Sequence, residues 1–155
     1  MLEYLWGYKT VAAFDVWTLD HFLNGLSIGT MAVIYNRKNL GGIFAFVKDK
    51  LSSSRQISRL KFKYSLIIVI MAAYLWEALE HYLETGLAGS WLANWLQGVE
   101  FWANRLVADP LMLVLGFLLV NRHPSLVWPA RVLSLTWLFI HLFVFPHSMY
   151  LQQWL

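Results

Sequence analysis

The chain has 155 residues and a formal net charge of +3, with 59% hydrophobic and only 14% charged residues. A soluble domain carries about a quarter charged residues, so this composition argues against a soluble fold and favours a helical membrane protein. Tryptophan, tyrosine and phenylalanine make up 17% of the chain, which is typical of proteins with aromatic side chains at the membrane interfaces. The absence of cysteine excludes disulfides, thiolate metal sites and cysteine nucleophiles.

We expect an all-α integral membrane protein in which residues 1–155 form a single membrane domain. About 20 apolar residues cross a bilayer, and the hydrophobic stretches predict about four transmembrane helices. The predicted spans are roughly residues 10–35, 64–84, 98–120 and 126–146. A short interfacial or re-entrant helix is expected beside the third span, over EFWANRLVA if Asp109 caps the following helix. The tryptophan-rich stretch SWLANWLQGVEFW is expected at the outer interface.

The loop predicted between the first two spans, residues 37–63, is strongly basic. It contains eight of the twelve lysines and arginines: Arg37, Lys38, Lys48, Lys50, Arg55, Arg59, Lys61 and Lys63. Cytoplasmic loops of membrane proteins carry such an excess of positive charge, which favours this reading over nucleic-acid binding. The sequence therefore predicts a multi-pass protein of the bacterial inner membrane, with this loop in the cytoplasm and both termini outside.

The first predicted span carries polar side chains in the stretch FDVWTLDHFLNGLSIG. Asp20, His21 and Asn24 are expected on a shared helix face, because residues three and four apart are neighbours on a helix. Gly25 and Gly29 form a small-xxx-small step that lets another helix approach closely. The two glycines are interpreted either as packing within the chain or as a surface for self-association.

The second span ends in WEALEHYLE, which places Glu77, Glu80, His81 and Glu84 in one helical stripe. Ionisable residues inside a membrane are costly and usually mark a functional site. The alternative is that the helix leaves the membrane early and the stripe is a solvated helix end.

The third span contains Asn104, Arg105 and Asp109, and the fourth contains His141. Arg105 and Asp109 are four residues apart and are expected either to pair or to leave Arg105 free for a phosphate headgroup. Alternatively, Asp109 caps a helix that begins at Pro110. For His141 the alternative to a ligand is a hydrogen-bonded packing role.

These polar residues are predicted to share the outer half of the bilayer, which indicates one outward-facing cavity. Carboxylates and imidazoles are ligands for Zn, Mn or Fe, so a divalent metal is a possible cofactor. The candidate metal ligands are His21, Glu77, Glu80, His81, Asp109 and His141. The candidate catalytic residues are His21, Glu77 and Asp109, and the candidate substrate-binding residues are Asp20, Asn24, Asn104 and Arg105.

Three blocks of the chain, DVWTLDHFLNGLSIG, WEALEHYLE and VEFWANRLVADPLMLVLGFLLV, resemble an uncharacterised bacterial polytopic membrane-protein family. That family, a domain of unknown function, has DWYT-SH-HG, WE-E and N-D-GF blocks, and the chain is more distantly similar to VanZ-like membrane proteins. The resemblance covers residues 14–30 and 74–122. The matching residues are Trp17, Thr18, His21, Gly25, Trp76, Glu77, Glu80, Asn104, Asp109, Gly116 and Phe117.

The chain departs from the family pattern at three other polar positions. Asp20 replaces a serine, Asn24 replaces a histidine and His81 replaces an asparagine. The resemblance implies a membrane fold rather than a particular activity, and it implies a site centred on His21, Glu77 and Asp109.

Three functions remain open from the sequence. The first is a small membrane protein that binds a divalent metal and acts on a lipid-borne or membrane-soluble substrate. The second is a non-catalytic accessory or assembly subunit of a larger membrane complex, whose partners are other membrane subunits. The third is a small oligomeric transporter.

Overall fold

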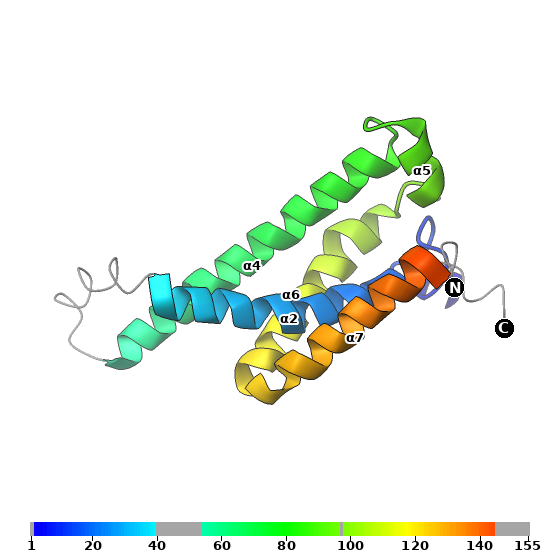
Figure 1. Cartoon of the computed structure of the whole chain (residues 1–155). Coiled ribbons are helices and arrows are strands. Elements are labelled where there is room, and N and C mark those ends of the chain that lie inside the picture. The colour runs from blue at the N-terminus through cyan, green and yellow to red at the C-terminus, as the bar shows by residue number, and fades with distance from the viewer. Residues whose placement is uncertain (1, 40–53, 97, 145–155) are drawn as a thin grey trace.

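The computed structural model describes residues 2–39, 54–96 and 98–144, and this part of the chain is helical (Figure 1). No strand is present within these ranges, where Trp6 and Phe14 form an isolated bridge. The elements are α1 (Leu2–Leu5), α2 (Val16–Asn39), α4 (Ser54–Glu84), α5 (Ser90–Leu96), the π-helix η1 (Asn104–Ala108), α6 (Asp109–Arg122), the 3₁₀ turn η2 (Pro124–Leu126), α7 (Val127–Phe139) and the π-helix η3 (Ile140–Val144).

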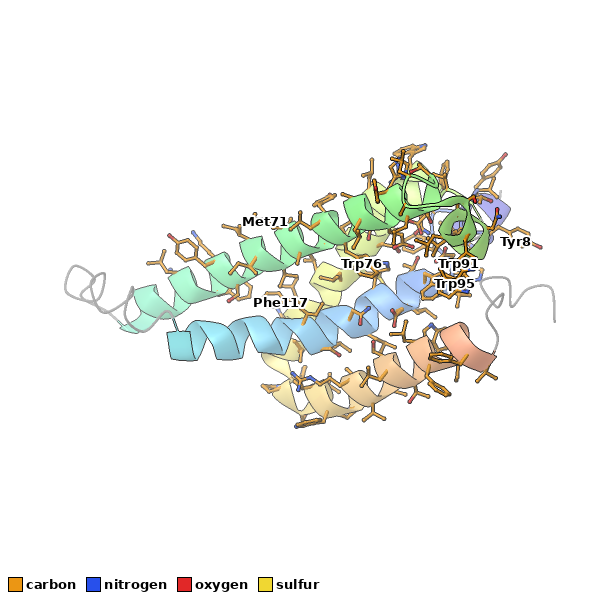
Figure 2. All side chains as sticks on the ribbon, turned by 45° about the horizontal axis from the view of Figure 1, so that its top comes forward. Tyr8, Met71, Trp76, Trp91, Trp95 and Phe117 are labelled. Atoms are coloured by element: carbon orange, nitrogen blue, oxygen red, sulfur yellow. The ribbon has the colours of Figure 1, made fainter. Side chains whose placement is uncertain are left out.

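The long helices form a bundle in which consecutive helices run in opposite directions (Figure 1). Helix α2 contacts α4, α6 and α7 and is therefore the central helix. The N-terminal segment, α5 and the C-terminal end of α7 lie at one end of the bundle, which we call the α5 end (Figures 1 and 2). The start of α4 and the end of α2 lie at the opposite end.

Two glycines allow α2 and α6 to cross at backbone contact. A Cβ atom added to Gly25 would lie 2.0 Å from the carbonyl oxygen of Leu113, and one added to Gly116 would lie 2.3 Å from that of Phe22. Helix α6 thus fills the space beside Gly25, which is used for packing within the chain and offers no room to a second copy. The surroundings of Gly29 lie outside the described side chains.

The bundle buries small apolar clusters and leaves many large apolar side chains on its surface. One cluster contains Val69, Ala73, Leu113 and Phe117, and another contains Leu26, Val120, Val127 and Ala130. Meanwhile side chains such as Leu75 and Leu135 are about two-thirds exposed. This arrangement fits lipid as the solvent of the outer surface better than water.

Two helical stretches are long and apolar enough to cross a membrane, Phe62–Glu84 and Asn104–Arg122. The most apolar part of each has only 22% and 44% of its residues buried, respectively. The core helix of a soluble protein is mostly buried, so these helices differ from that type. The structure therefore confirms an all-helical fold with two candidate spans, whereas four crossings stay a prediction.

The first predicted span begins too early. Helix α2 starts at Val16, because the preceding residues fold into a turn in which the Gly7 N–H donates to the Phe14 carbonyl oxygen. Asp15 then caps the helix: the Thr18 N–H donates to Asp15 Oδ1 at 3.0 Å, and the Asp15 N–H donates to Thr18 Oγ1 at 3.1 Å. This reciprocal pair is a capping box, which fixes where the helix begins.

The second predicted span agrees closely with the candidate span Phe62–Glu84, but its helix begins before the span. Helix α4 starts at Ser54 and has 31 residues, which is about 46 Å at 1.5 Å per residue and longer than a ~30 Å hydrocarbon core. Arg55, Arg59, Lys61 and Lys63 therefore lie on its first turns rather than in a loop. The rest of the predicted basic loop, residues 40–53, lies outside the described residues.

The third span is one continuous helix, because Ala108 and Asp109 both have helical dihedral angles between η1 and α6. The alternative in which Asp109 caps a separate helix is therefore wrong. The fourth span corresponds to η2, α7 and η3, and its last residues, 145–146, lie outside the described ranges.

The tryptophan-rich stretch before the third span contains the short helix α5, whereas the expected separate helix over EFWANRLVA is not seen, because η1 continues into α6. None of the residues of α5 is buried, and Trp91 is 73% exposed. Figure 2 shows Tyr8, Trp91 and Trp95 gathered at the α5 end. Exposed tryptophans and tyrosines at the ends of a bundle are typical of a membrane interface.

Candidate metal site

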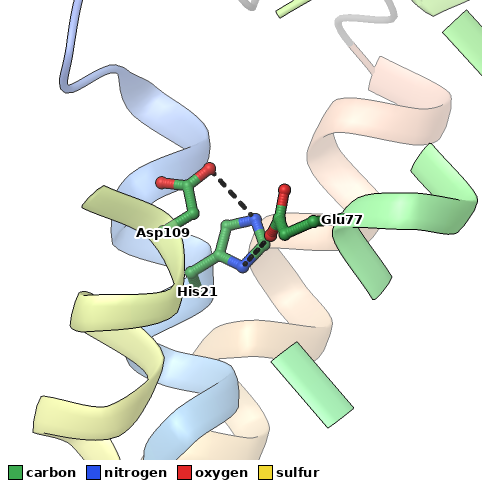
Figure 3. A group of neighbouring side chains, drawn as sticks. All are labelled: His21, Glu77 and Asp109. Atoms are coloured by element: carbon green, nitrogen blue, oxygen red, sulfur yellow. Dashed lines mark ion pairs between the residues drawn. The ribbon is translucent and has the colours of Figure 1, made fainter. Parts of the chain in front are cut away.

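Three helices place an imidazole and two carboxylates side by side within the bundle. His21 comes from α2, Glu77 from α4 and Asp109 from the start of α6 (Figure 3). His21 Nδ1 lies 3.6 Å from Glu77 Oε1, and His21 Nε2 lies 3.4 Å from Asp109 Oδ2. The three residues are only 6%, 2% and 0% exposed, so water contributes little to their solvation.

A π-helical turn directs Asp109 into this group. The Asp109 N–H donates to the carbonyl oxygen of Asn104, five residues earlier, as in a π-helix. In a regular α-helix, residues five apart point about 140° away from each other. The wider turn instead lets Asn104 and Asp109 both be fully buried, at 0% exposure.

The carboxylates of this group are not satisfied by the described residues. Both oxygens of Glu77 and both of Asp109 are buried without a hydrogen bond of normal geometry in that part of the chain. The Thr18 hydroxyl lies close enough to interact with Asp109. Buried carboxylates without partners are costly, so two of them beside one imidazole require a bound cation or protons.

The spacing of the donor atoms suits a metal ion. One ligand atom from each of the three residues lies within 4.8 Å of the other two. Two ligands of a tetrahedral ion with bonds of about 2.1 Å are about 3.4 Å apart, which matches the 3.4 Å between His21 Nε2 and Asp109 Oδ2. Only one ring nitrogen can bind a given ion, so the other nitrogen is left to face a carboxylate that orients the ring.

A second buried network lies next to this group, at the α5 end. Lys9 donates to Glu84 Oε1, and the Glu100 N–H donates to Glu84 Oε2 at 3.0 Å. The Asn104 amide donates to Glu100 Oε1 at 3.1 Å and accepts from Thr18 Oγ1 at 3.1 Å. This network connects the N-terminal segment to the C-terminal end of α4 and to the start of η1. Its role is to hold these parts of the fold together.

The network corrects two expectations from the sequence. Glu84 is 3% exposed and Glu77 is 2% exposed, so the stripe on α4 is not a solvated helix end. Asn104 contacts protein on both sides of its amide and is not free for a substrate. Lys9 was missed by sequence reasoning, because nothing in the linear pattern connects residue 9 with residue 84.

Outside the two candidate spans, burial raises the pKa of the Glu100 carboxyl, and repulsion from Asp109 raises it further. Burial also raises the pKa of Asp15, against the hydrogen bonds that Thr18 donates.

The remaining candidate residues lie elsewhere. Asn24 donates to Asp20 Oδ2 at 2.9 Å, and the Ser134 hydroxyl of α7 donates to Asn24 Oδ1 at 2.8 Å and to Asp20 Oδ1 at 3.3 Å. These contacts place Asp20 and Asn24 on the α7 side of α2. His21, Asp20 and Asn24 still line one cavity together, while His21 is also close to Glu77 and Asp109.

Arg105 contacts Nδ1 of His81 instead of pairing with Asp109. Glu80 is half-buried beside Trp76, and neither Glu80 nor His81 belongs to the His21–Glu77–Asp109 group. The side chain of His141 lies outside the described residues. Three of the six proposed ligands are therefore brought together.

Comparisons with known proteins found no match to this chain among family models, curated proteins or solved structures. The resemblance to the uncharacterised bacterial family and to VanZ-like proteins therefore stays a prediction.

Proposed function

We propose that the chain is a small multi-pass protein of a bacterial inner membrane that binds one divalent metal ion at His21, Glu77 and Asp109. In this proposal α2, α4, α6 and α7 all cross the bilayer, the basic start of α4 faces the cytoplasm, and both termini lie outside. The positive-inside rule supports this orientation. The site then lies in the outer half of the membrane, since it is nearer the α5 end.

One observation carries the metal proposal: two buried carboxylates, Glu77 and Asp109, flank one imidazole, and none of their four oxygens has a hydrogen bond of normal geometry among the described residues. A divalent cation would balance the charge of the two carboxylates. Carboxylates buried at a purely structural, apolar position would be costly. Carboxylate and imidazole donors are compatible with Zn, Mn or Fe.

When bound, the metal would polarise an oxygen atom of a ligand or lower the pKa of a water molecule. His21 would supply one ring nitrogen to the ion while a carboxylate holds the opposite ring nitrogen. The remaining carboxylate oxygens would accept or return a proton next to the ion. We propose that this chemistry acts on a lipid-borne or membrane-soluble substrate, because the site lies within the helical bundle.

The test is the metal content of the purified protein and of single variants. We expect about one ion per chain in the wild type and loss of the ion in Glu77→Gln, Asp109→Asn and His21→Ala. Glu80→Gln is the matched control, because Glu80 lies one turn further along α4 and outside the group. Equal metal content in Glu77→Gln and Glu80→Gln would reject the site.

The accessory-subunit and transporter functions stay predictions. Co-purification of other membrane subunits in mild detergent, together with an absence of bound metal, would favour the accessory role.

A further inference from the structure

Two cavities adjoin at His21. One, of about 200 Å³, lies between α2, the end of α4, α5 and α7. The other, of about 340 Å³, lies between α2, the middle of α4 and α6. Both are lined by His21, Asn24 and Trp76, so the polar centre stands where the two spaces meet.

The walls of both cavities are mainly hydrocarbon and indole. The first is lined by side chains such as Trp17, Leu83, Trp95 and Leu138, and the second by Ile28, Ala72 and Leu113. Binding pockets of about 300–1,000 Å³ with apolar walls and a few convergent polar groups are typical of small-molecule sites. The volume and the walls suit a flexible alkyl chain.

The polar lining defines the headgroup. Asp20 and Glu80 line the first cavity, and Asn24 lines both. Among the described residues that line these cavities, none is lysine or arginine. Arg105 is engaged with His81 instead. A lining with carboxylate and amide oxygens and no lysine or arginine favours a head that donates hydrogen bonds, such as a hydroxyl or an amine, and disfavours a phosphate.

Trp76 provides the route from the membrane. Its side chain is 53% exposed on α4, within the candidate span Phe62–Glu84, and also lines both cavities. A membrane-dissolved molecule could thus pass from lipid beside Trp76 to His21 without crossing water.

We propose that the paired cavities bind a single-chain amphiphile with an uncharged or cationic hydrogen-bond-donating head at His21 and its alkyl chain between α2 and α4. This inference rests on the proposed function, because it names the class of substrate on which the metal site would act. It does not require the metal for binding.

The test uses the full chain in phosphatidylcholine nanodiscs with radiolabelled dodecanol, dodecylamine and dodecyl phosphate. We expect saturable binding of the alcohol or the amine and no saturable binding of the phosphate. Ala72→Phe should fill the second cavity. Each methylene it excludes weakens binding by about fourfold, so the loss should reach about tenfold or more once two are displaced.

Ala78→Phe is the matched control, because Ala78 lies on the same helix, is exposed and lines neither cavity. Ile28→Trp fills the second cavity from α2 and provides an independent variant if Ala72→Phe does not fold. Saturable phosphate binding, equal binding by wild type and both filled variants, or an equal loss in Ala78→Phe would overturn the proposal.

Metal content measured on the same samples separates the two proposals. Ala72→Phe that keeps its metal but loses dodecanol supports the cavity site. Wild-type protein that binds dodecanol without metal supports the cavity site and contradicts the metal proposal. Protein that contains the metal but binds none of the three probes supports the metal proposal and contradicts the cavity site.

Discussion

Replacement of Gly116 by alanine tests whether close helix crossing positions the metal site. The added Cβ would lie 2.3 Å from the Phe22 carbonyl oxygen, 2.8 Å from the Leu26 nitrogen and 3.0 Å from the Gly25 carbonyl carbon. All three atoms are backbone, so no side chain can rotate away. Since comfortable contacts need about 3.5 Å, α2 and α6 must separate locally by about 1 Å.

This separation should lower the stability of the protein and also change the geometry of the metal site. Overpacking of this kind costs about 1–3 kcal/mol in free energy of unfolding, which lowers Tm by roughly 2–10 °C for a chain of this size. His21 lies on α2 and Asp109 on α6, 3.4 Å apart at their nearest polar atoms. Moving the helices apart by about 1 Å takes these atoms beyond the ~3.4 Å separation of shared ligands.

The assay is thermal unfolding in detergent, with metal content measured on the same preparation. We expect Gly116→Ala to melt earlier and to retain less metal, although no ligand has been changed. Leu119→Ala on the same helix is the control, because Leu119 is partly exposed and lies outside the glycine contact. A Gly116→Ala protein with wild-type Tm and metal content would refute the close-crossing argument.

Three further predictions concern the π-turn, the buried ion pair and the topology. Deletion of the exposed Val107 should convert η1 to a regular helix in which Asn104 and Asp109, then four residues apart, still share one face, so metal binding should be retained; loss of the metal would show that the π-turn itself is needed to place Asp109. Lys9→Met should lower the free energy of unfolding by about 3–5 kcal/mol, because Glu84 is left buried without its ion-pair partner. Adding Glu84→Gln should recover part of this loss. A Lys9→Met variant as stable as the wild type in denaturant would contradict the role of the pair. A cysteine at position 153, replacing Gln153, should react with an impermeant reagent from outside, whereas a cysteine replacing Ser53 should not; the opposite labelling would invert the topology.

The sequence allowed the group of His21, Glu77 and Asp109 to be predicted, because buried ionisable residues in apolar helices must find partners. It did not allow the partners of the neighbouring residues to be predicted. Asp20 precedes His21 by one residue, which turns its side chain by about 100° around the helix. As a result Asp20 contacts Ser134 on α7 while His21 faces α4 and α6.

Two other features depend on long-range structure. One interpretation of the sequence made the stripe on α4 a solvated helix end, yet Lys9, 75 residues away, donates to Glu84 at the end of that stripe. The role of Asn104 depends on a π-turn, and the local sequence NRLVADP carries no pattern that distinguishes this turn from a regular helix. Such features arise from tertiary packing rather than from helical periodicity.

The central claim is that His21, Glu77 and Asp109 share one divalent ion. X-ray absorption spectroscopy on the metal-loaded protein measures it most directly, because the nearest shell distinguishes imidazole nitrogen from carboxylate oxygen ligands. We predict one ion per chain with a single imidazole and carboxylate oxygens in that shell, and loss of the imidazole signal in His21→Ala. A shell that contains several imidazoles, or one unchanged in His21→Ala, would contradict the account.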